Sequence, residues 1–153
     1  KKIKFVVFDL DGVFTDGKIY ILENEQMKCY NGKDSYGLKL LNQNGYKTGL
    51  ITAHDSKVVD NMEHIVSRMD YISKGSYKKI NVLEKWKQEL NLDYDEIAYI
   101  GDDIPDLEII KTVGFSSCPN NAVDEIKKNV NYICKNKGGN GAVREFCEYI
   151  ISN

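Results

Sequence analysis

Short apolar runs alternate along the chain with longer segments in which apolar residues recur every three or four positions. The runs are typical of buried strands, and the longer segments are typical of helices that bury one face. The expected strands cover residues 3–8, 47–52, 71–73, 96–100, 115–117 and 131–133. The expected helices cover residues 35–44, 57–66, 79–90, 105–112, 123–128 and 142–151. This alternation predicts the α/β class, with a Rossmann-like parallel sheet and helices on both faces.

One segment, 18–30, breaks the alternation, because residues 18–22 and 27–30 resemble two short strands around a polar turn. We expect a β-hairpin inserted after the first strand, too small to form a domain of its own. The chain of 153 residues is therefore expected to form one domain, 1–153. The apolar residues of the hairpin have no obvious place within one subunit, so we expect an oligomerisation surface. The alternative is a flap that folds onto its own subunit.

Composition argues against several classes of partner. The formal net charge of -2 does not favour nucleic acid or an anionic membrane as the main partner, since both call for a basic patch. The apolar runs are too short to span a bilayer. The four cysteines have neither zinc-site nor disulfide-framework spacing, which predicts reduced thiols and a cytoplasmic protein.

Two carboxylates, Asp9 and Asp11, follow the first expected strand directly. Residues two apart in a strand face the same side, so both can face one point at the carboxyl end of the sheet, where such folds bind ligands. Two like charges this close favour a divalent cation or a raised pKa on one of them. An ordinary Asp-Gly turn is the alternative.

A second acidic group follows the expected strand 96–100, where Gly101 precedes Asp102, Asp103 and Asp106. If the two strands are neighbours, up to four carboxylates converge. Charge of that density calls for Mg²⁺, which prefers carboxylate and water oxygens. The alternative for this group is a helix cap.

Further polar residues stand at the same edge of the expected sheet. Thr52 ends the strand 47–52 and could bind a phosphoryl oxygen, or it could simply cap the next helix. Lys79 opens a helix and could offset phosphate charge as a point cation. Its neighbour Lys78 is an equal candidate by position, and a solvated surface lysine is the alternative for both.

The chain resembles the haloacid dehalogenase superfamily of Mg²⁺-dependent phosphotransferases over essentially its whole length. The residues that carry the resemblance are Asp9-x-Asp11-Gly12, Thr52, Lys79 and Gly101-Asp102-Asp103-x-x-Asp106. The segments 11–17 and 138–145, and a hairpin in place of a large cap domain, make it more specific. These features resemble the 3-deoxy-D-manno-octulosonate 8-phosphate phosphatases and the related C-terminal domain of acylneuraminate cytidylyltransferases.

This resemblance implies a chemical role for each catalytic residue. Asp9 would be the nucleophile that attacks phosphorus and forms an aspartyl-phosphate. Asp11 would donate a proton to the leaving sugar oxygen and later accept one from the attacking water. Thr52 and Lys79 would bind the phosphoryl oxygens, and the family pattern selects Lys79 over Lys78.

A Mg²⁺ cofactor is also implied by the resemblance. Its ligands would be the carboxylates of Asp9 and Asp102 and the backbone carbonyl of Asp11, with water and phosphate completing the coordination. Asp103 and Asp106 would orient the lysine or the metal-bound waters.

The implied substrate is a phosphorylated 3-deoxy-2-keto sugar acid of the octulosonate 8-phosphate or nonulosonate 9-phosphate type. Lys33 and Asp34 lie in a segment that resembles the rim of the active site in this family. Arg144 is a candidate partner for the substrate carboxylate, with a solvated helix start as the alternative. His54 stands where the relatives commonly have the arginine or glutamate that reads the sugar, unless it merely begins the next helix. It therefore leaves the identity of the sugar open.

The family pattern also implies a homotetramer, in which the hairpins meet and the Gly-rich segment 138–141 covers the active site of a neighbouring subunit. Two other functions remain open from the sequence. One is a catalytically weak oligomerisation domain associated with a sugar-acid cytidylyltransferase. The other is a phosphate-accepting signalling receiver, which the Asp9-x-Asp11 spacing and the hairpin disfavour.

Overall fold

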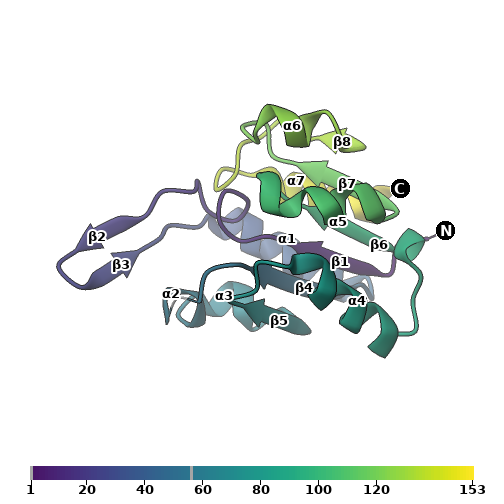
Figure 1. The fold of residues 1–153 in the computed structure, drawn as a ribbon, viewed down its shortest axis with the longest axis horizontal. Helices are drawn as coiled ribbons and strands as arrows, with labels where there is room; N and C mark the ends of the chain where they lie inside the picture. Colours follow the sequence, from purple (N-terminus) through teal and green to yellow (C-terminus); the bar gives the residue numbers. More distant parts are fainter. Residues whose placement is uncertain (1, 56) are drawn as a thin grey trace.

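A parallel sheet forms the centre of the protein in the computed structural model, which describes residues 2–55 and 57–153 (Figure 1). The strand order in this part of the chain is β5-β4-β1-β6-β7-β8, and all neighbouring pairs are parallel. The strands are β1 Phe5–Phe8, β4 Lys47–Thr52, β5 Tyr71–Lys74, β6 Ile97–Ile100, β7 Phe115–Cys118 and β8 Tyr132–Ile133. Each lies within two residues of its expected bounds, so the predicted α/β sheet is confirmed.

Helices connect the strands. They are α1 Gly32–Gln43, α2 Lys57–Asp60, α3 Glu63–Val66, α4 Lys79–Glu89, α5 Leu107–Thr112, α6 Asp124–Lys127 and α7 Ala142–Ser152, with 3₁₀ turns η1 Tyr94–Glu96 and η2 Ile104–Asp106. The prediction of a single helix over residues 57–66 is wrong. Met62 leaves the helical conformation, with φ -82° and ψ 60°, and is buried, so the chain bends there into two short helices. Among the described helices, none is long and apolar enough to cross a membrane.

Both faces of the sheet are covered, which explains why β1 is apolar throughout. Val6 and Phe8 belong to the buried cluster that includes side chains of α1, α3 and α7. Phe5 and Val7 belong to a second cluster, which includes side chains of α4, α5 and α6. Alternate residues of a strand point to opposite faces, so a strand buried on both sides has no polar position to spare. The first polar residue comes where the strand ends, at Asp9.

The hairpin consists of β2 Tyr20–Leu22 and β3 Glu25–Met27 and extends away from the sheet (Figure 1). Its second strand begins two residues earlier than expected, because Glu23 takes a left-handed conformation, with φ 54°, and closes a tight turn. Both strands are exposed along their whole length, so the alternative of a flap folded onto its own subunit is wrong for them. An antiparallel bridge between Thr15 and Tyr30 fastens the base of the hairpin to the rest of the subunit.

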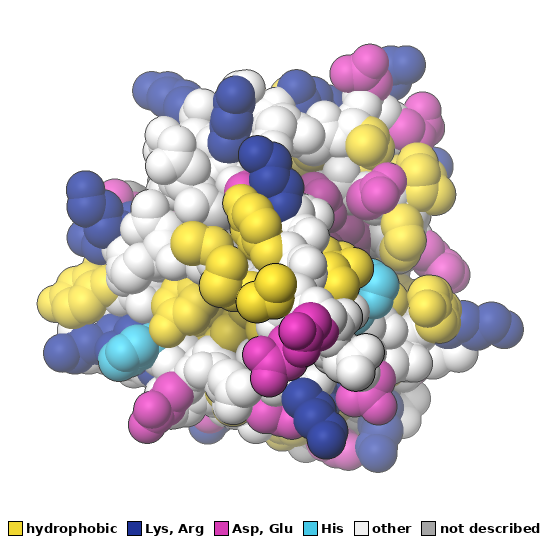
Figure 2. Space-filling model, turned by 90° about the vertical axis from the view of Figure 1, so that its left-hand side faces the viewer, with side chains coloured by type: hydrophobic (Ala, Val, Ile, Leu, Met, Phe, Trp, Pro, Cys, Tyr) yellow, Lys and Arg dark blue, Asp and Glu magenta, His cyan; other side chains and the backbone are white. Residues whose placement is uncertain are grey.

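Hydrophobic side chains gather on the exposed hairpin. Figure 2 views the molecule from that end, and yellow side chains occupy the centre of the face. The exposed apolar residues of this segment are Ile19, Tyr20, Ile21, Leu22 and Met27. Leu22 is 77% exposed, which is costly for a side chain of its size.

Candidate active site

The sheet order brings three expected site residues to one edge. β1 lies between β4 and β6, with Phe8 paired to Leu50 and to Ile100, so Asp9, Thr52 and Asp102 lie at the carboxyl ends of three adjacent strands. A pocket of about 210 Å³ opens there. The predicted catalytic and metal-binding residues line it: Asp9, Asp11, Thr52, Lys79, Asp102, Asp103 and Asp106.

Asp9 is held at the bottom of this pocket. Its backbone N–H donates to the Ile100 carbonyl over 3.1 Å, and its Oδ1 accepts a hydrogen bond from Lys79 Nζ over 2.7 Å. Burial raises the pKa of the Asp9 carboxyl well above its ordinary value, and Asp106 adds to the rise while Lys79 opposes it. The carboxylate therefore gains from any further cation beside it.

Lys79 is the buried cation of the pocket. It is the first residue of α4, and its Nζ lies 2.7 Å from Asp9 Oδ1 and 2.8 Å from Asp106 Oδ1. Burial opposes its charge, but the two carboxylates raise the pKa of Lys79 above its ordinary value, so it stays protonated. Lys78 is exposed. The geometry thus distinguishes two lysines that the sequence pattern by itself left equal.

Asp106 has hydrogen bonds on both carboxylate oxygens. Its Oδ1 accepts from Lys79 and from the Tyr99 hydroxyl, and its Oδ2 accepts from the backbone N–H groups of Asp102 and Asp103 over 3.0 and 3.3 Å. A Cβ at Gly101 would lie 2.5 Å from the Asp106 Cβ, so only glycine lets the two approach this closely. With both oxygens in hydrogen bonds, Asp106 orients the Lys79 ammonium and the backbone of Asp102 and Asp103.

Tyr99 was not found by the sequence reasoning. It is fully buried in β6, within a run that otherwise reads as a plain apolar strand. Burial raises the pKa of its hydroxyl well above the ordinary value, and Asp106 adds to this, so the hydroxyl remains a hydrogen-bond donor. The only cue in the sequence is the Tyr99 hydroxyl, the one polar side-chain group in the otherwise apolar strand β6.

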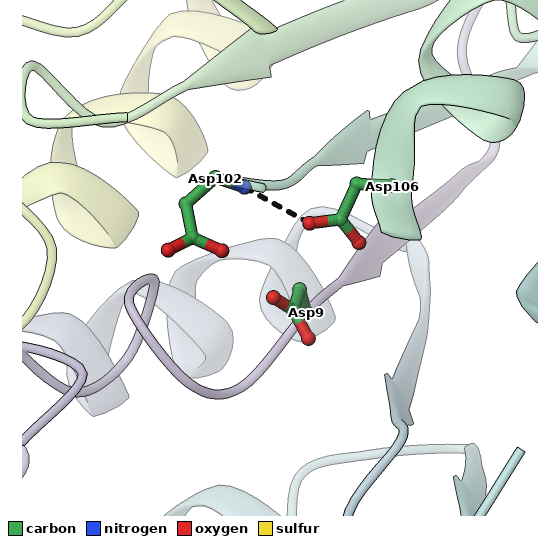
Figure 3. Close-up of side chains that lie close together, drawn as sticks. All are labelled: Asp9, Asp102 and Asp106. Atoms are coloured by element: carbon green, nitrogen blue, oxygen red, sulfur yellow. Dashed lines mark hydrogen bonds between the residues drawn. The ribbon is translucent and has the colours of Figure 1, made fainter. Parts of the chain in front are cut away.

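Three carboxylates converge closely enough to hold a metal ion. Ligand oxygens of Asp9, Asp102 and Asp106 lie within 4.8 Å of one another, and Figure 3 shows the three side chains turned toward a common point. Burial, with help from Asp106, raises the pKa of Asp102 to about 6. Oxygen donors of this kind suit a hard divalent cation. Asp106 has both oxygens in hydrogen bonds, whereas Asp9 pairs with Lys79 through Oδ1, so Asp9 and Asp102 are the better candidates to bind it.

Gly12 makes room for the Asp102 carboxylate. The residue has φ +79°, and a Cβ built on it would lie 1.8 Å from Asp102 Oδ2. The loop after β1 and the loop after β6 therefore touch through backbone and carboxylate, which sets the backbone of the Asp11–Gly12 turn beside Asp102.

Thr52 and His54 form the side of the pocket nearest β4. Thr52 is buried, and its Oγ1 accepts a weak hydrogen bond of 3.4 Å from the His54 backbone N–H. Among residues 2–55 and 57–153, the Thr52 hydroxyl donates no hydrogen bond, so its hydrogen can be offered to an anionic oxygen. His54 is exposed and lines the same pocket, so it stands where a substrate would pass.

Asp103 differs from expectation. It is exposed, and its Oδ1 accepts from the Ile104 backbone N–H over 2.7 Å as the N-cap of η2. The side chain that orients Lys79 is Asp106. The helix-cap alternative therefore holds for Asp103, because its carboxylate is engaged by the turn that it begins.

Asp34 is likewise a structural residue within the subunit. It is fully buried, and its carboxylate accepts from the backbone N–H groups of Gly141 and Arg144 over 3.2 and 2.9 Å, at the start of α7. This corrects the expectation of a substrate contact at the rim, since a carboxylate that caps a helix inside the protein is not free to meet a ligand.

Lys33 and Arg144 do not reach the acidic pocket within one subunit. They line a separate depression of about 530 Å³ beside α7. Arg144 Nε pairs with Glu148 over 2.6 Å. Their expected contact with substrate stays a prediction.

The Gly-rich segment packs on its own subunit. Gly139 N–H donates to the Val13 carbonyl over 3.0 Å, and a Cβ at Gly138 would lie 1.8 Å from the Gly12 carbonyl oxygen. Glu145 secures the preceding residues by accepting from the backbone N–H groups of 135 and 136. The close approach to the loop after β1 gives these glycines a role within their own subunit. That the segment covers the active site of a neighbouring subunit stays a prediction.

Asp11, at the mouth of the pocket, meets a residue that the sequence reasoning did not consider. Its Oδ1 accepts from Lys28 Nζ over 2.7 Å. Its Oδ2 is buried and has no hydrogen-bond partner among residues 2–55 and 57–153. Lys28 lies 17 residues away in sequence at the end of the hairpin, and no local pattern links the two.

The sequence is similar to those of known hydrolases. The family model for haloacid dehalogenase-like hydrolases matches residues 18–146. The 3-deoxy-D-manno-octulosonate 8-phosphate phosphatase KdsC of Yersinia pestis is 29% identical over 150 residues, which are 97% of this chain and 80% of that protein.

Solved structures agree over nearly the whole chain. A probable YrbI family phosphatase from Pseudomonas syringae has a TM-score of 0.95 at 38% identity, covering 99% of this chain and 86% of its own. The 3-deoxy-D-manno-octulosonate 8-phosphate phosphatase of Moraxella catarrhalis, in complex with magnesium, phosphate and KDO, has a TM-score of 0.93 at 33% identity, with 98% and 86% covered. The chain belongs to the haloacid dehalogenase-like hydrolase family.

Proposed function

We propose that the protein is a Mg²⁺-dependent phosphomonoester hydrolase that acts on a phosphorylated 3-deoxy-2-keto sugar acid, of the octulosonate 8-phosphate or nonulosonate 9-phosphate type. The observation that carries the proposal is the pair of Asp9 and Lys79, 2.7 Å apart at the bottom of a pocket that also holds Asp102. The pair offers a nucleophile and a cation for a phosphoryl group. The similarity to the octulosonate phosphatases supports the class of substrate.

Each step uses a side chain of this pocket. A carboxylate oxygen of Asp9 attacks phosphorus, the bond from phosphorus to the sugar oxygen breaks, and Asp11 gives that oxygen a proton. Water then attacks the aspartyl-phosphate, Asp11 takes a proton from the water, and phosphate leaves with Asp9 restored. Lys79 and Thr52 bind the phosphoryl oxygens through both steps.

The metal would be held by the carboxylates of Asp9 and Asp102 and by the backbone carbonyl of Asp11. The donor set fits Mg²⁺, because it is made of oxygen atoms and because burial raises the pKa of Asp9 and of Asp102, an effect that a bound cation would oppose. Mg²⁺ bound there supplies positive charge opposite the anionic phosphoryl group.

Phosphate release from a panel of sugar phosphates tests the proposal. The panel contains octulosonate 8-phosphate, nonulosonate 9-phosphates and common hexose phosphates, each with Mg²⁺ and with EDTA. We expect turnover that needs metal and is strongest on one keto-acid phosphate, and a loss of at least ~10³-fold in Asp9→Asn because the covalent step is removed. Turnover that survives in Asp9→Asn would contradict the mechanism.

We also propose that the hairpins hold the subunits together as a homotetramer, in the cytoplasm. The exposed apolar residues of β2 and β3 support the assembly, and the four free cysteines, three of them buried, support the compartment. Light scattering should give about four times the chain mass of 17.5 kDa. Leu22→Lys should lower that mass, and a monomeric wild type would contradict the assembly.

The same surface favours one other function, a catalytically weak oligomerisation domain that accompanies a sugar-acid cytidylyltransferase. Leu22 and Met27 would serve such a domain equally well. Phosphate release and light scattering together distinguish the two functions. The oligomerisation domain would have the mass of an assembly but would release no phosphate from any substrate.

A further inference from the structure

We propose that Lys28, at the base of the hairpin, is a positioning residue that fixes the carboxylate of Asp11 for its two proton transfers; this rests on the proposed function. Lys28 Nζ lies 2.7 Å from Asp11 Oδ1. The Lys28 side chain is 1% exposed, although the residue as a whole is half-buried and directly follows the exposed strand β3. Its neighbours Met27 and Cys29 both face solvent.

The burial of Lys28 marks the pair as specific. A lysine normally keeps its ammonium in water, and removing it from water is costly unless a carboxylate compensates. Ordering the four rotatable bonds of the lysine side chain adds an entropic cost. Exposed ion pairs contribute little and form by chance. In an extended backbone, successive side chains point to opposite sides. The Lys28 side chain therefore points inward, and those of Met27 and Cys29 point outward.

The ion pair with Lys28 gives the two oxygens of Asp11 different environments. Oδ1 is held by Lys28, whereas Oδ2 is buried without a hydrogen-bond partner in the described part of the chain. A buried polar atom left unpaired is rare in folded proteins and often belongs to a functional group. We assign the proton exchange with the sugar oxygen, and later with water, to Oδ2. Lys28 stops the carboxylate from rotating and so keeps Oδ2 turned to the reacting atoms.

This assignment has a kinetic signature. Both halves of the reaction need Asp11, and the phosphoryl group is bound by Lys79 and Thr52, which Lys28 does not contact. Loss of Lys28 should therefore lower kcat and leave KM nearly unchanged. A misplacement of a catalytic group by about 1 Å costs on the order of 10²-fold, so we expect kcat to fall by about 10- to 100-fold.

The test compares Lys28→Met with Lys18→Met, which removes an exposed lysine from the same hairpin and is expected to behave like the wild type. The sugar-acid phosphate gives kcat and KM. With 4-nitrophenyl phosphate, whose leaving group departs without a proton, Lys28→Met should keep a first burst of one nitrophenol per site and then turn over slowly. Mass and thermal unfolding of both variants show whether fold and assembly are intact.

Several results would overturn the proposal. A kcat within twofold of the wild type in folded Lys28→Met excludes the positioning role. A raised KM with unchanged kcat assigns Lys28 to substrate binding instead, and loss of the burst places its effect on the attack by Asp9. If Lys28→Met does not fold, Lys28→Arg decides, because it keeps the charge and moves the donor atoms; an unchanged kcat in that variant contradicts the proposal.

Failure of this proposal differs from failure of the proposed function. A wild type that releases phosphate only when Asp9 is present, with an equally active Lys28→Met, removes the role of Lys28 alone. A wild type that releases no phosphate from any substrate removes the proposed function, and the role of Lys28 falls with it.

Discussion

Asp106 accepts hydrogen bonds from the Tyr99 hydroxyl and from the Lys79 ammonium on the same carboxylate oxygen, Oδ1. A buried tyrosine of the central sheet therefore supports the lysine that faces Asp9. Tyr99 itself does not line the pocket, so any effect of its hydroxyl on turnover passes through Asp106 and Lys79.

Tyr99→Phe should destabilise the protein and weaken substrate binding. Removing the hydroxyl leaves Asp106 with one donor fewer inside the protein, a loss of about 1–3 kcal/mol in the free energy of unfolding. KM should rise several-fold because Lys79 is held less firmly. Urea unfolding and steady-state kinetics check both. Tyr94→Phe is the matched control, since its hydroxyl also donates to a carboxylate, that of Glu84, but away from the pocket.

Lys79→Met should be severe where Lys78→Met is mild. Without Lys79, Asp9 and Asp106 remain buried with less compensation, and removing one partner of a buried ion pair costs about 3–5 kcal/mol. A lost donor to the phosphoryl group should lower kcat/KM by at least ~10²-fold. Lys78 is exposed and should show neither effect. Equal losses in the two variants would contradict the assignment of Lys79.

The metal-free protein should become less stable as pH rises from about 4 to 7. Burial raises the pKa of Asp102 to about 6 and raises that of Asp9 as well, so these two carboxyls bind more protons in the folded than in the unfolded state in this range. Burial also raises the pKa of Asp34, whereas hydrogen bonds lower the pKa of Glu84 and, against the effect of burial, that of Glu145, and these two oppose the trend. A folded state with excess protons gains stability when pH falls and loses it when pH rises. Thermal unfolding in EDTA at several pH values measures the trend.

Adding Mg²⁺ should reverse that trend. Protons and the cation compete for the same carboxylates, so the increase in melting temperature caused by Mg²⁺ should be small near pH 5 and large near pH 8. Asp102→Asn should reduce the increase at every pH. An equal increase at pH 5 and pH 8 would show that the cation binds elsewhere.

Gly138→Ala should destabilise the protein where Gly32→Ala does not. The new Cβ would lie 1.8 Å from the Gly12 carbonyl oxygen, and backbone must move to relieve it, which costs about 1–3 kcal/mol. At Gly32, a Cβ meets no atom within 4 Å. Because Gly12 also touches Asp102, the displaced loop should weaken Mg²⁺ binding as well. Chemical unfolding and metal titration of both variants provide the measurement.

The edge of the sheet and most of the pocket could be predicted from sequence because their signals are local. Asp9 and Asp102 come within two residues of the end of an apolar run, Thr52 ends one, and parallel strands place such positions side by side. Lys79 begins a helix for which the apolar spacing is clear. In each case a few neighbouring residues contain the information.

The residues that were missed or misassigned depend on contacts between distant parts of the chain. Asp34 accepts a hydrogen bond from Gly141, the N-cap residue of α7, 107 residues later in the chain, and no pattern near residue 34 indicates that partner. Tyr99 lies inside an apolar strand, where β-sheet propensity explains an aromatic residue without any further role. Lys28 directly follows the exposed strand β3. Only the position of the hairpin base relative to the pocket shows that its side chain points inward, to Asp11.

The two-sided hairpin constrains any effort to engineer a monomeric form of this protein. Its outward side chains, such as Leu22, are open to polar substitution, because they are largely exposed in the subunit. One residue from outward-facing Met27, however, Lys28 fixes the orientation of Asp11, and a substitution that shifts this part of the strand would be transmitted to the catalytic pocket. Solubilising changes therefore belong at the tip, and the base should keep its native sequence.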